Sequence, residues 1–134
     1  MSPIPLCANE SASNLDRIMD WHRAGAIAGA TLKTIKLGGI APTARAAIVC
    51  DTLGLSINLA SKTGESSIGA ATLLHLGYAI PNLDWGINIT NQYLSADLVR
   101  KPIGQKGGSV ECPTAPGLGI EVGERAIARF KITG

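Results

Sequence analysis

The chain has 134 residues, of which 46% are hydrophobic, 16% charged and 4% aromatic, and its formal net charge is +2. This composition is enough for one domain with a buried core. The basic residues form no block and are not interleaved with aromatic residues, which argues against nucleic-acid binding. Gly, Pro or charged residues interrupt every apolar run before it reaches membrane-spanning length, so we expect no transmembrane helix.

The cysteines and the N-terminal segment indicate a compartment. Cys7, Cys50 and Cys112 are odd in number and widely spaced, which is typical of reduced thiols and not of a disulfide framework or a zinc site. The first residues lack the basic region of a signal peptide. We therefore expect a cytoplasmic protein.

The first part of the chain predicts strand, helix, strand. Residues 4–8 form a short apolar run that is typical of a buried strand. Apolar residues at helical spacing from Leu15 onward predict a helix, with Ser13 and Asp16 forming a capping box. A second strand is expected to end in residues 31–37, which combine β-branched residues with lysines and lead into a pair of glycines.

The alternation continues toward the C-terminus. Residues 42–53 predict a helix with proline in its first turn, and residues 55–60 predict a third strand. Residues 68–79 predict a helix that is apolar nearly all round. Residues 83–85 are a very short candidate for a fourth strand, and 124–130 for a closing helix. This order with short loops implies right-handed parallel units in an α/β fold, within a single domain over residues 1–134.

Polar clusters follow the first three predicted strands: Asn9 with Glu10, Lys33 with Lys36, and residues 62–65. Successive clusters are close to one βαβ repeat apart, about 30 residues. Equal phase puts all three at the same end of a parallel sheet, where barrel enzymes carry their active sites. A desolvated lysine there can act as a general base, and a carboxylate can orient it or hold a divalent cation.

Plainer interpretations of the same residues stay open. Lys33 can form a structural ion pair with Glu65, and Glu65 can be an acid at a helix N-terminus, where the helix dipole favours it. Lys36 can support the site or face solvent. His75 lies among leucines in a predicted helix and fits a core or interface histidine, and Cys50 fits a small buried hydrophobe.

Four motifs resemble the C-terminal half of the mandelate racemase and muconate lactonizing enzymes of the enolase superfamily. Their order and spacing match along nearly the whole chain, and together they make a stronger signal than any one alone. The motifs are Ala8-Asn9-Glu10-Ser11, Lys33-Thr34-Ile35-Lys36-Leu37-Gly38-Gly39, Gly64-Glu65-Ser66-Ser67-Ile68-Gly69 with His75-Leu76, and Pro116-Gly117-Leu118-Gly119-Ile120-Glu121-Val122.

The resemblance implies a fold, a reaction and a site. The fold is a partial TIM-type barrel, with four parallel strands alternating with helices and an irregular C-terminal extension. The reaction abstracts the proton α to a carboxylate and stabilises the enediolate with Mg²⁺. Lys33 corresponds to an acid/base lysine and Glu65 to a glutamate of the site. Asn9 stands where the family has its third metal-binding carboxylate, and Glu10 could replace it if the strand end shifted by one residue.

Two departures from the family shape the functional expectation. Asn9 removes a negative charge from the metal site, and the family's cap, other lysine motif and first two metal-binding acids have no counterpart in these residues. We therefore expect a protein that is inactive alone. The alternatives are one half of a split enzyme that needs a separate N-terminal half, and a non-enzymatic oligomer that binds small carboxylates through Lys33 and Lys36. The open edges of a half-barrel predict a homodimer or a larger oligomer.

Overall fold

The computed structural model describes residues 3–132, which form two compact units. Unit 1 comprises the chain up to Ala60 together with Leu76–Asn88, and unit 2 comprises Ser61–His75 together with the residues from Ile89 onward. Within residues 3–132, no helix is both long and apolar enough to cross a membrane. The interpretation of the whole chain as a single domain stays a prediction.

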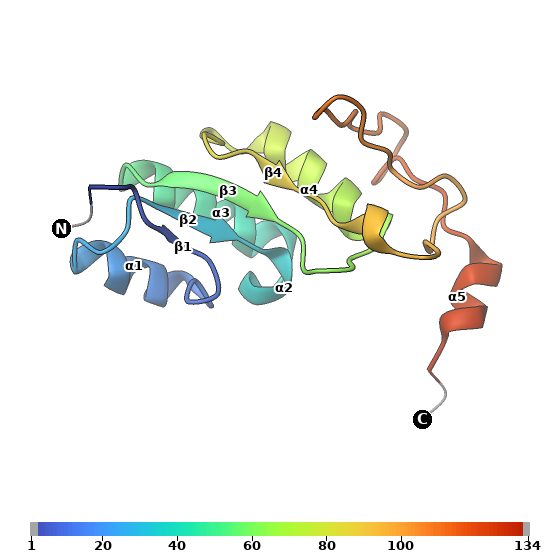
Figure 1. Cartoon of the computed structure of the whole chain (residues 1–134), viewed down its shortest axis with the longest axis horizontal. Helices are drawn as coiled ribbons and strands as arrows, with labels where there is room; N and C mark the ends of the chain where they lie inside the picture. The colour runs from blue at the N-terminus through green and yellow to red at the C-terminus, as the bar shows by residue number, and fades with distance from the viewer. Residues whose placement is uncertain (1–2, 133–134) are drawn as a thin grey trace. The chain divides into compact units, whose positions relative to one another are not determined.

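Unit 1 contains a parallel four-stranded sheet in the order β1–β2–β3–β4 (Figure 1). The strands are β1 (Cys7–Ala8), β2 (Gly29–Leu32), β3 (Ser56–Ala60) and β4 (Ile87–Asn88). Every neighbouring pair is parallel, so the predicted strand order and direction are confirmed.

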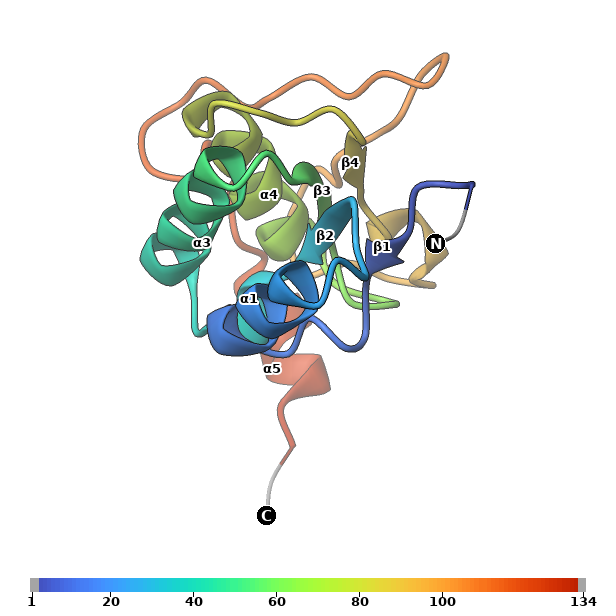
Figure 2. The same ribbon diagram turned by 90° about the vertical axis from the view of Figure 1, so that its left-hand side faces the viewer.

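Two helices of unit 1 connect the first three strands. Helix α1 (Leu15–Arg23) joins β1 to β2, and α3 (Ile40–Thr52) precedes β3. Figure 2 shows α1 and α3 on the same side of the sheet, as right-handed parallel connections require. Side chains at the centre of β2 and β3 are fully buried, as are side chains of both helices. These residues are Ala30, Leu32, Ile57, Leu59, Ile18, Ala47 and Cys50. Burying a Leu or Ile side chain contributes about 1.5–3 kcal/mol, so this layer is the main source of stability for unit 1.

The strand expected over residues 31–37 is wrong beyond Leu32. Residues Thr34–Leu37 form the short helix α2, and Lys33 is its extended N-terminal cap residue. Gly38 has φ 89°, a left-handed conformation that favours glycine. This conformation lets the N–H groups of Gly38 and Gly39 donate to the Thr34 carbonyl, at 3.0 and 2.8 Å. The glycine pair therefore ends a helical turn and not the predicted strand.

The fourth strand also differs from its predicted position. Residues 83–85, expected as strand, belong to a turn in which the Gly86 N–H donates to the Leu83 carbonyl at 3.1 Å. The strand itself is Ile87–Asn88. Asn58 of β3 is buried and holds this region, because its Nδ2 donates to the carbonyls of Trp85 and Gly86 and to Asn88 Oδ1.

The first strand–helix unit is close to its prediction. Only Cys7–Ala8 of the expected strand over 4–8 is paired. The cap of α1 is Asn14, whose Oδ1 accepts from the Arg17 N–H at 2.9 Å, and not the predicted Ser13. An asparagine amide oxygen and a serine hydroxyl serve equally well at this position.

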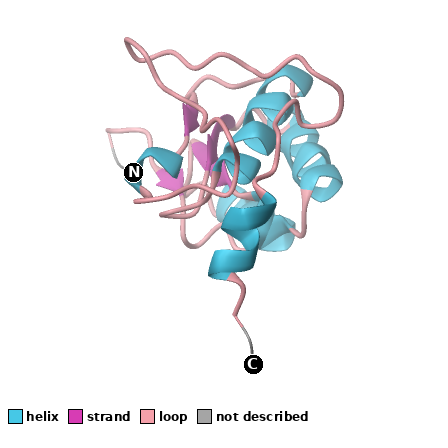
Figure 3. Cartoon of the chain, turned by 90° about the vertical axis from the view of Figure 1, so that its right-hand side faces the viewer, coloured by secondary structure: helices cyan, strands magenta, loops and turns pink. Residues whose placement is uncertain are grey.

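Unit 2 is largely irregular. It contains the first part of α4 (Ser67–Ala79), the 3-10 turn η1 (Asn91–Tyr93) and α5 (Glu124–Phe130), so the predicted closing helix is confirmed. Figure 3 shows that loops make up most of the chain between β4 and α5. A polar network organises these loops: Ser67, fully buried, donates from Oγ to Asp97 at 2.6 Å and accepts from the Ile103 N–H at 2.9 Å.

Candidate functional site

The carboxyl ends of β1 and β2 bring two of the predicted polar clusters together. Glu10 follows β1 and Lys33 follows β2, and the distance from Lys33 Nζ to Glu10 Oε1 is 2.6 Å. Lys36 Nζ lies 3.0 Å from the other oxygen of the same carboxylate, Oε2. One carboxylate therefore bridges two ammonium groups, because parallel strands place residues of equal phase at the same edge.

The two lysines are held more firmly than the acid. The side chains of Lys33 and Lys36 are 12% and 18% exposed, whereas that of Glu10 is 75% exposed. Lys36 also donates to the backbone carbonyls of Asn9 and Glu10, both at 3.0 Å. The lysine stems are thus packed in the protein while the ammonium groups meet a carboxylate at the surface.

The same contacts set the charge of Glu10. The hydrogen bond from Lys33 is the main cause, followed by that from Lys36 and by the Coulombic attraction of both, and together they lower the pKa of Glu10 to about 2. The carboxylate is therefore ionised throughout the neutral range, and the cluster carries one negative and two positive charges.

The described residues do not fit a magnesium site on their own. Mg²⁺ prefers near-octahedral coordination by oxygen atoms. The Asn9 side chain is exposed, and the Glu10 carboxylate, the alternative ligand named from the sequence, already accepts from two ammonium groups. Between residues 3 and 132, no group of three or more His, Cys, Asp or Glu side chains is placed to hold a metal ion. The assignments of Asn9 and Glu10 as ligands stay predictions.

Glu65 lies in unit 2, in the turn before α4. Its Oε2 accepts from the Lys62 N–H at 2.9 Å, and its own N–H donates to Thr90 Oγ1 at 3.2 Å. Thr90 Oγ1 in turn donates to the Lys62 carbonyl at 2.7 Å. These bonds fix the half-buried glutamate just ahead of the N-terminus of α4. This is the position expected of an acid that the helix dipole favours. Its catalytic role stays a prediction.

The structure adds a role for Glu10 that sequence reasoning missed. The sequence offers Lys33 as a structural partner of Glu65, and Glu10 as a replacement metal ligand. The ion pair that Lys33 makes is with Glu10. A usable signal was present, because Glu10 is the second residue after β1 and Lys33 is the first residue after β2.

Comparison with known proteins decides the family. The model of the family described as enolase C-terminal domain-like matches residues 1–126. The chain belongs to this family. Its relatives include muconate cycloisomerase 1 of Rhodococcus opacus, 31% identical over 126 residues that are 93% of this chain and 34% of the relative. A probable glucarate dehydratase of Streptomyces coelicolor is 26% identical over 93% of this chain and 29% of the relative.

Solved structures of family members have the same fold over this region. The 2-chloromuconate cycloisomerase of Rhodococcus opacus 1CP matches with a TM-score of 0.89 and 26% identity, over 98% of this chain and 36% of that one. The muconate lactonizing enzyme of Pseudomonas putida matches with a TM-score of 0.87 and 27% identity, over 96% and 36%. The family and the partial-barrel fold class are therefore confirmed, and the chain spans about a third of the length of these relatives.

Proposed function

We propose that the chain supplies the C-terminal part of a cycloisomerase-type active site, in which Lys33 transfers a proton at the carbon α to a carboxylate. The observation that carries this proposal is the position of Lys33 at the carboxyl end of β2, with its Nζ 2.6 Å from Glu10 Oε1. The matched relatives named as muconate cycloisomerases support the reaction class.

The lysine acts in both directions of such a reaction. As a neutral amine, Lys33 Nζ accepts the α-proton, and as an ammonium group it returns the proton to the same carbon. The contact with Glu10 holds Nζ at a defined point. Lys36 binds the second oxygen of Glu10 and two backbone carbonyls, so it positions the carboxylate.

The proposal includes a requirement for further protein. A substrate carboxylate needs cationic groups around it when a second negative charge develops at its α-carbon. In the described residues, Lys33 and Lys36 are already paired with Glu10. We therefore expect the 134 residues to be inactive alone, and a complementary part, in the same protein or in a separate chain, to complete the site and to hold the magnesium ion that the family resemblance implies.

A chimeric enzyme tests the proposal without relying on assembly of separate parts. This chain replaces the matched segment of 126 residues in the Rhodococcus opacus muconate cycloisomerase. The loss of muconate absorbance measures turnover, and circular dichroism measures folding. We expect turnover to rise when Asn9→Asp restores the carboxylate of the family motif, and to fall by at least about 100-fold in the additional variant Lys33→Ala.

Matched variants make this result specific. Lys101→Ala removes an exposed lysine of unit 2 and should leave turnover unchanged. A folded chimera whose activity survives Lys33→Ala contradicts the proposal, as does turnover by the isolated chain. Carboxylate binding by Lys33 and Lys36 is the weaker alternative, because Glu10 already pairs with both ammonium groups.

A further inference from the structure

Unit 2 contains a cysteine–histidine pair away from the lysine cluster. Cys112 Sγ lies 3.6 Å from His75 Nδ1, and His75 Nε2 lies 3.2 Å from the Leu118 carbonyl oxygen. A carbonyl oxygen only accepts hydrogen bonds, so Nε2 carries a proton, and Nδ1 is the acceptor when the imidazole is neutral. The thiol of Cys112 therefore donates to a base whose orientation a third group fixes, which is the usual arrangement of an activated nucleophile.

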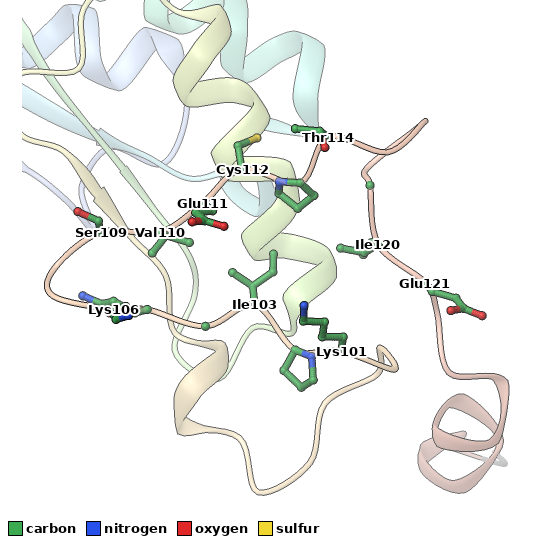
Figure 4. Close-up of a pocket in the computed structure, with 15 residues that line it drawn as sticks. Lys101, Ile103, Lys106, Ser109, Val110, Glu111, Cys112, Thr114, Ile120 and Glu121 are labelled. Atoms are coloured by element: carbon green, nitrogen blue, oxygen red, sulfur yellow. The ribbon is translucent and has the colours of Figure 1, made fainter.

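Cys112 also lines a cavity. A pocket of about 880 Å³ in unit 2 is lined by residues 101–106, 109–114 and 119–121, and Cys112 is part of its wall. Figure 4 shows Cys112 on the loop that passes beside α4, the helix that carries His75. Lys101, Lys106 and Glu111 contribute charged side chains to the same lining. A small molecule in this cavity can therefore approach Cys112.

The other two cysteines differ from Cys112 in ways that make them internal references. Cys50 is fully buried in the core of unit 1, and this burial raises the pKa of its thiol to about 11. Cys7 is exposed, and the polar contacts of its Sγ are the Thr31 hydroxyl at 3.3 Å and the Ala8 carbonyl at 3.8 Å. Neither contact is an imidazole base. Cys7 therefore shows how fast an exposed thiol without such a base reacts, and Cys50 shows how fast a buried thiol reacts.

We propose that Cys112 is a reactive thiol that exchanges with small-molecule disulfides entering this cavity, with His75 as its base. His75 Nδ1 takes the thiol proton, and Sγ attacks one sulfur of the disulfide. The S–S bond of the small molecule breaks as the new one forms, and the departing thiolate takes the proton back from the imidazolium. The products are a mixed disulfide at Cys112 and one free thiol, so the disulfide is the only oxidant.

The test compares three thiols within one folded protein. The full chain is incubated with excess dithiodipyridine, a neutral disulfide, at pH 7, and peptide mapping by mass spectrometry follows each cysteine with time. We expect Cys112 to react about tenfold faster than Cys7, because His75 takes the thiol proton of Cys112 during exchange, whereas the contacts of the Cys7 thiol are a hydroxyl and a carbonyl. Cys50 should remain unmodified, which also reports that unit 1 is folded. Cys112→Ser should remove the fast phase of thiopyridone release.

Substitution of the base gives the second readout. His75→Gln should slow Cys112 about tenfold and leave the rate of Cys7 unchanged, whereas His22→Gln, on α1 of unit 1, should change neither. The proposal is overturned if Cys112 reacts no faster than Cys7, or if a folded His75→Gln protein reacts at the original rate. If Cys50 becomes reactive in His75→Gln, that variant is not folded and its rate is not used. The comparison of Cys112 with Cys7 in the unmodified chain then decides whether Cys112 is a reactive thiol.

Discussion

Lys33 and Glu10 are 23 positions apart in the sequence, yet Lys33 Nζ lies 2.6 Å from Glu10 Oε1. The contact follows from the topology, because β1 and β2 are adjacent and parallel, and Glu10 is the second residue after β1 while Lys33 is the first after β2. A second lysine, Lys36, binds the other oxygen of the same carboxylate. The carboxylate of Glu10 and the ammonium groups of Lys33 and Lys36 therefore form an ordered charge cluster.

The titration of Glu10 tests that arrangement. Since the two lysines lower the pKa of Glu10 from 4.5 to about 2, its carboxyl carbon resonance should titrate with a midpoint near pH 2. Lys33→Ala should raise the midpoint further than Lys36→Ala, because the hydrogen bond from Lys33 is the largest cause. Nuclear magnetic resonance of the ¹³C-labelled chain measures this. A midpoint near 4.5 in the unmodified chain would contradict the ion pairs.

The same pKa shift predicts the sign of a pH effect on stability. The carboxyl has a lower pKa in the folded chain than in the unfolded chain, so the stabilisation is complete above about pH 4.5 and is lost as the pH falls toward 2. The effect should be small and should weaken with added salt, because Glu10 faces solvent. Urea denaturation at pH 6 and pH 3, compared between the unmodified chain and Glu10→Gln, measures it.

Gly29→Ala tests the close packing of the central strands. A methyl group at this position of β2 would meet the Ser56 carbonyl oxygen and the ring of Trp85, both within unit 1. Overpacking of this kind costs about 1–3 kcal/mol, which denaturation in urea can measure. Gly104→Ala is the matched control, because nothing lies within 4 Å of the added atom. Equal stability of the two variants would argue against this packing.

Asp97→Ala tests the polar network of unit 2. The Asp97 carboxylate accepts from the Ser67 N–H and hydroxyl, so it caps α4 from a distant part of the chain. Its removal leaves the buried Ser67 without these partners, which should cost about 1–3 kcal/mol. Asp51→Ala removes an exposed aspartate of α3 and should change the free energy of unfolding far less. Thermal and urea denaturation of both variants decide the point.

The oligomeric state is a prediction that rests on the open sheet edge. β1 pairs only with β2 in the described sheet, and the neighbouring Leu6 is 51% exposed. An unpaired edge beside apolar side chains favours association. Light scattering behind a sizing column should therefore report a dimer or a larger closed assembly, and Leu6→Lys should reduce its size. A monodisperse monomer at micromolar concentration would show that the edge stays unpaired.

The alternation of apolar runs predicted most of the fold. Buried parallel strands read as continuous apolar segments, so β2 and β3 and the helices around them were recognisable. The errors arose where local conformation depends on tertiary contacts. Residues 34–37 suit a strand by composition, yet they form a helical turn that Gly38 ends. Residues 83–85 lie in a turn, and the position of β4 depends on Asn58, whose contacts with residues 85–88 no periodicity reveals.

The site residues show the same division. The strand-end positions of Glu10 and Lys33 were readable, because spacing in successive units predicts a common edge of the sheet. Their direct ion pair could not be predicted, because the spacing of residues indicates which side chains lie at the same edge of the sheet but not which of them form a contact. The sequence favours a core or interface histidine at position 75, because the contact of His75 with Cys112, 37 positions away, depends on the path of an irregular loop.

The two units are interleaved along the chain, and this has a consequence for biosynthesis. Unit 1 takes up the chain again at Leu76 and ends at Asn88, whereas most of unit 2 follows from Ile89 onward. All four strands of the described sheet are thus synthesised once Asn88 has left the ribosome. The loop that carries Cys112 and the residues that bind Ser67 emerge later. Translation therefore delivers the lysine–glutamate cluster before it delivers the cysteine–histidine pair.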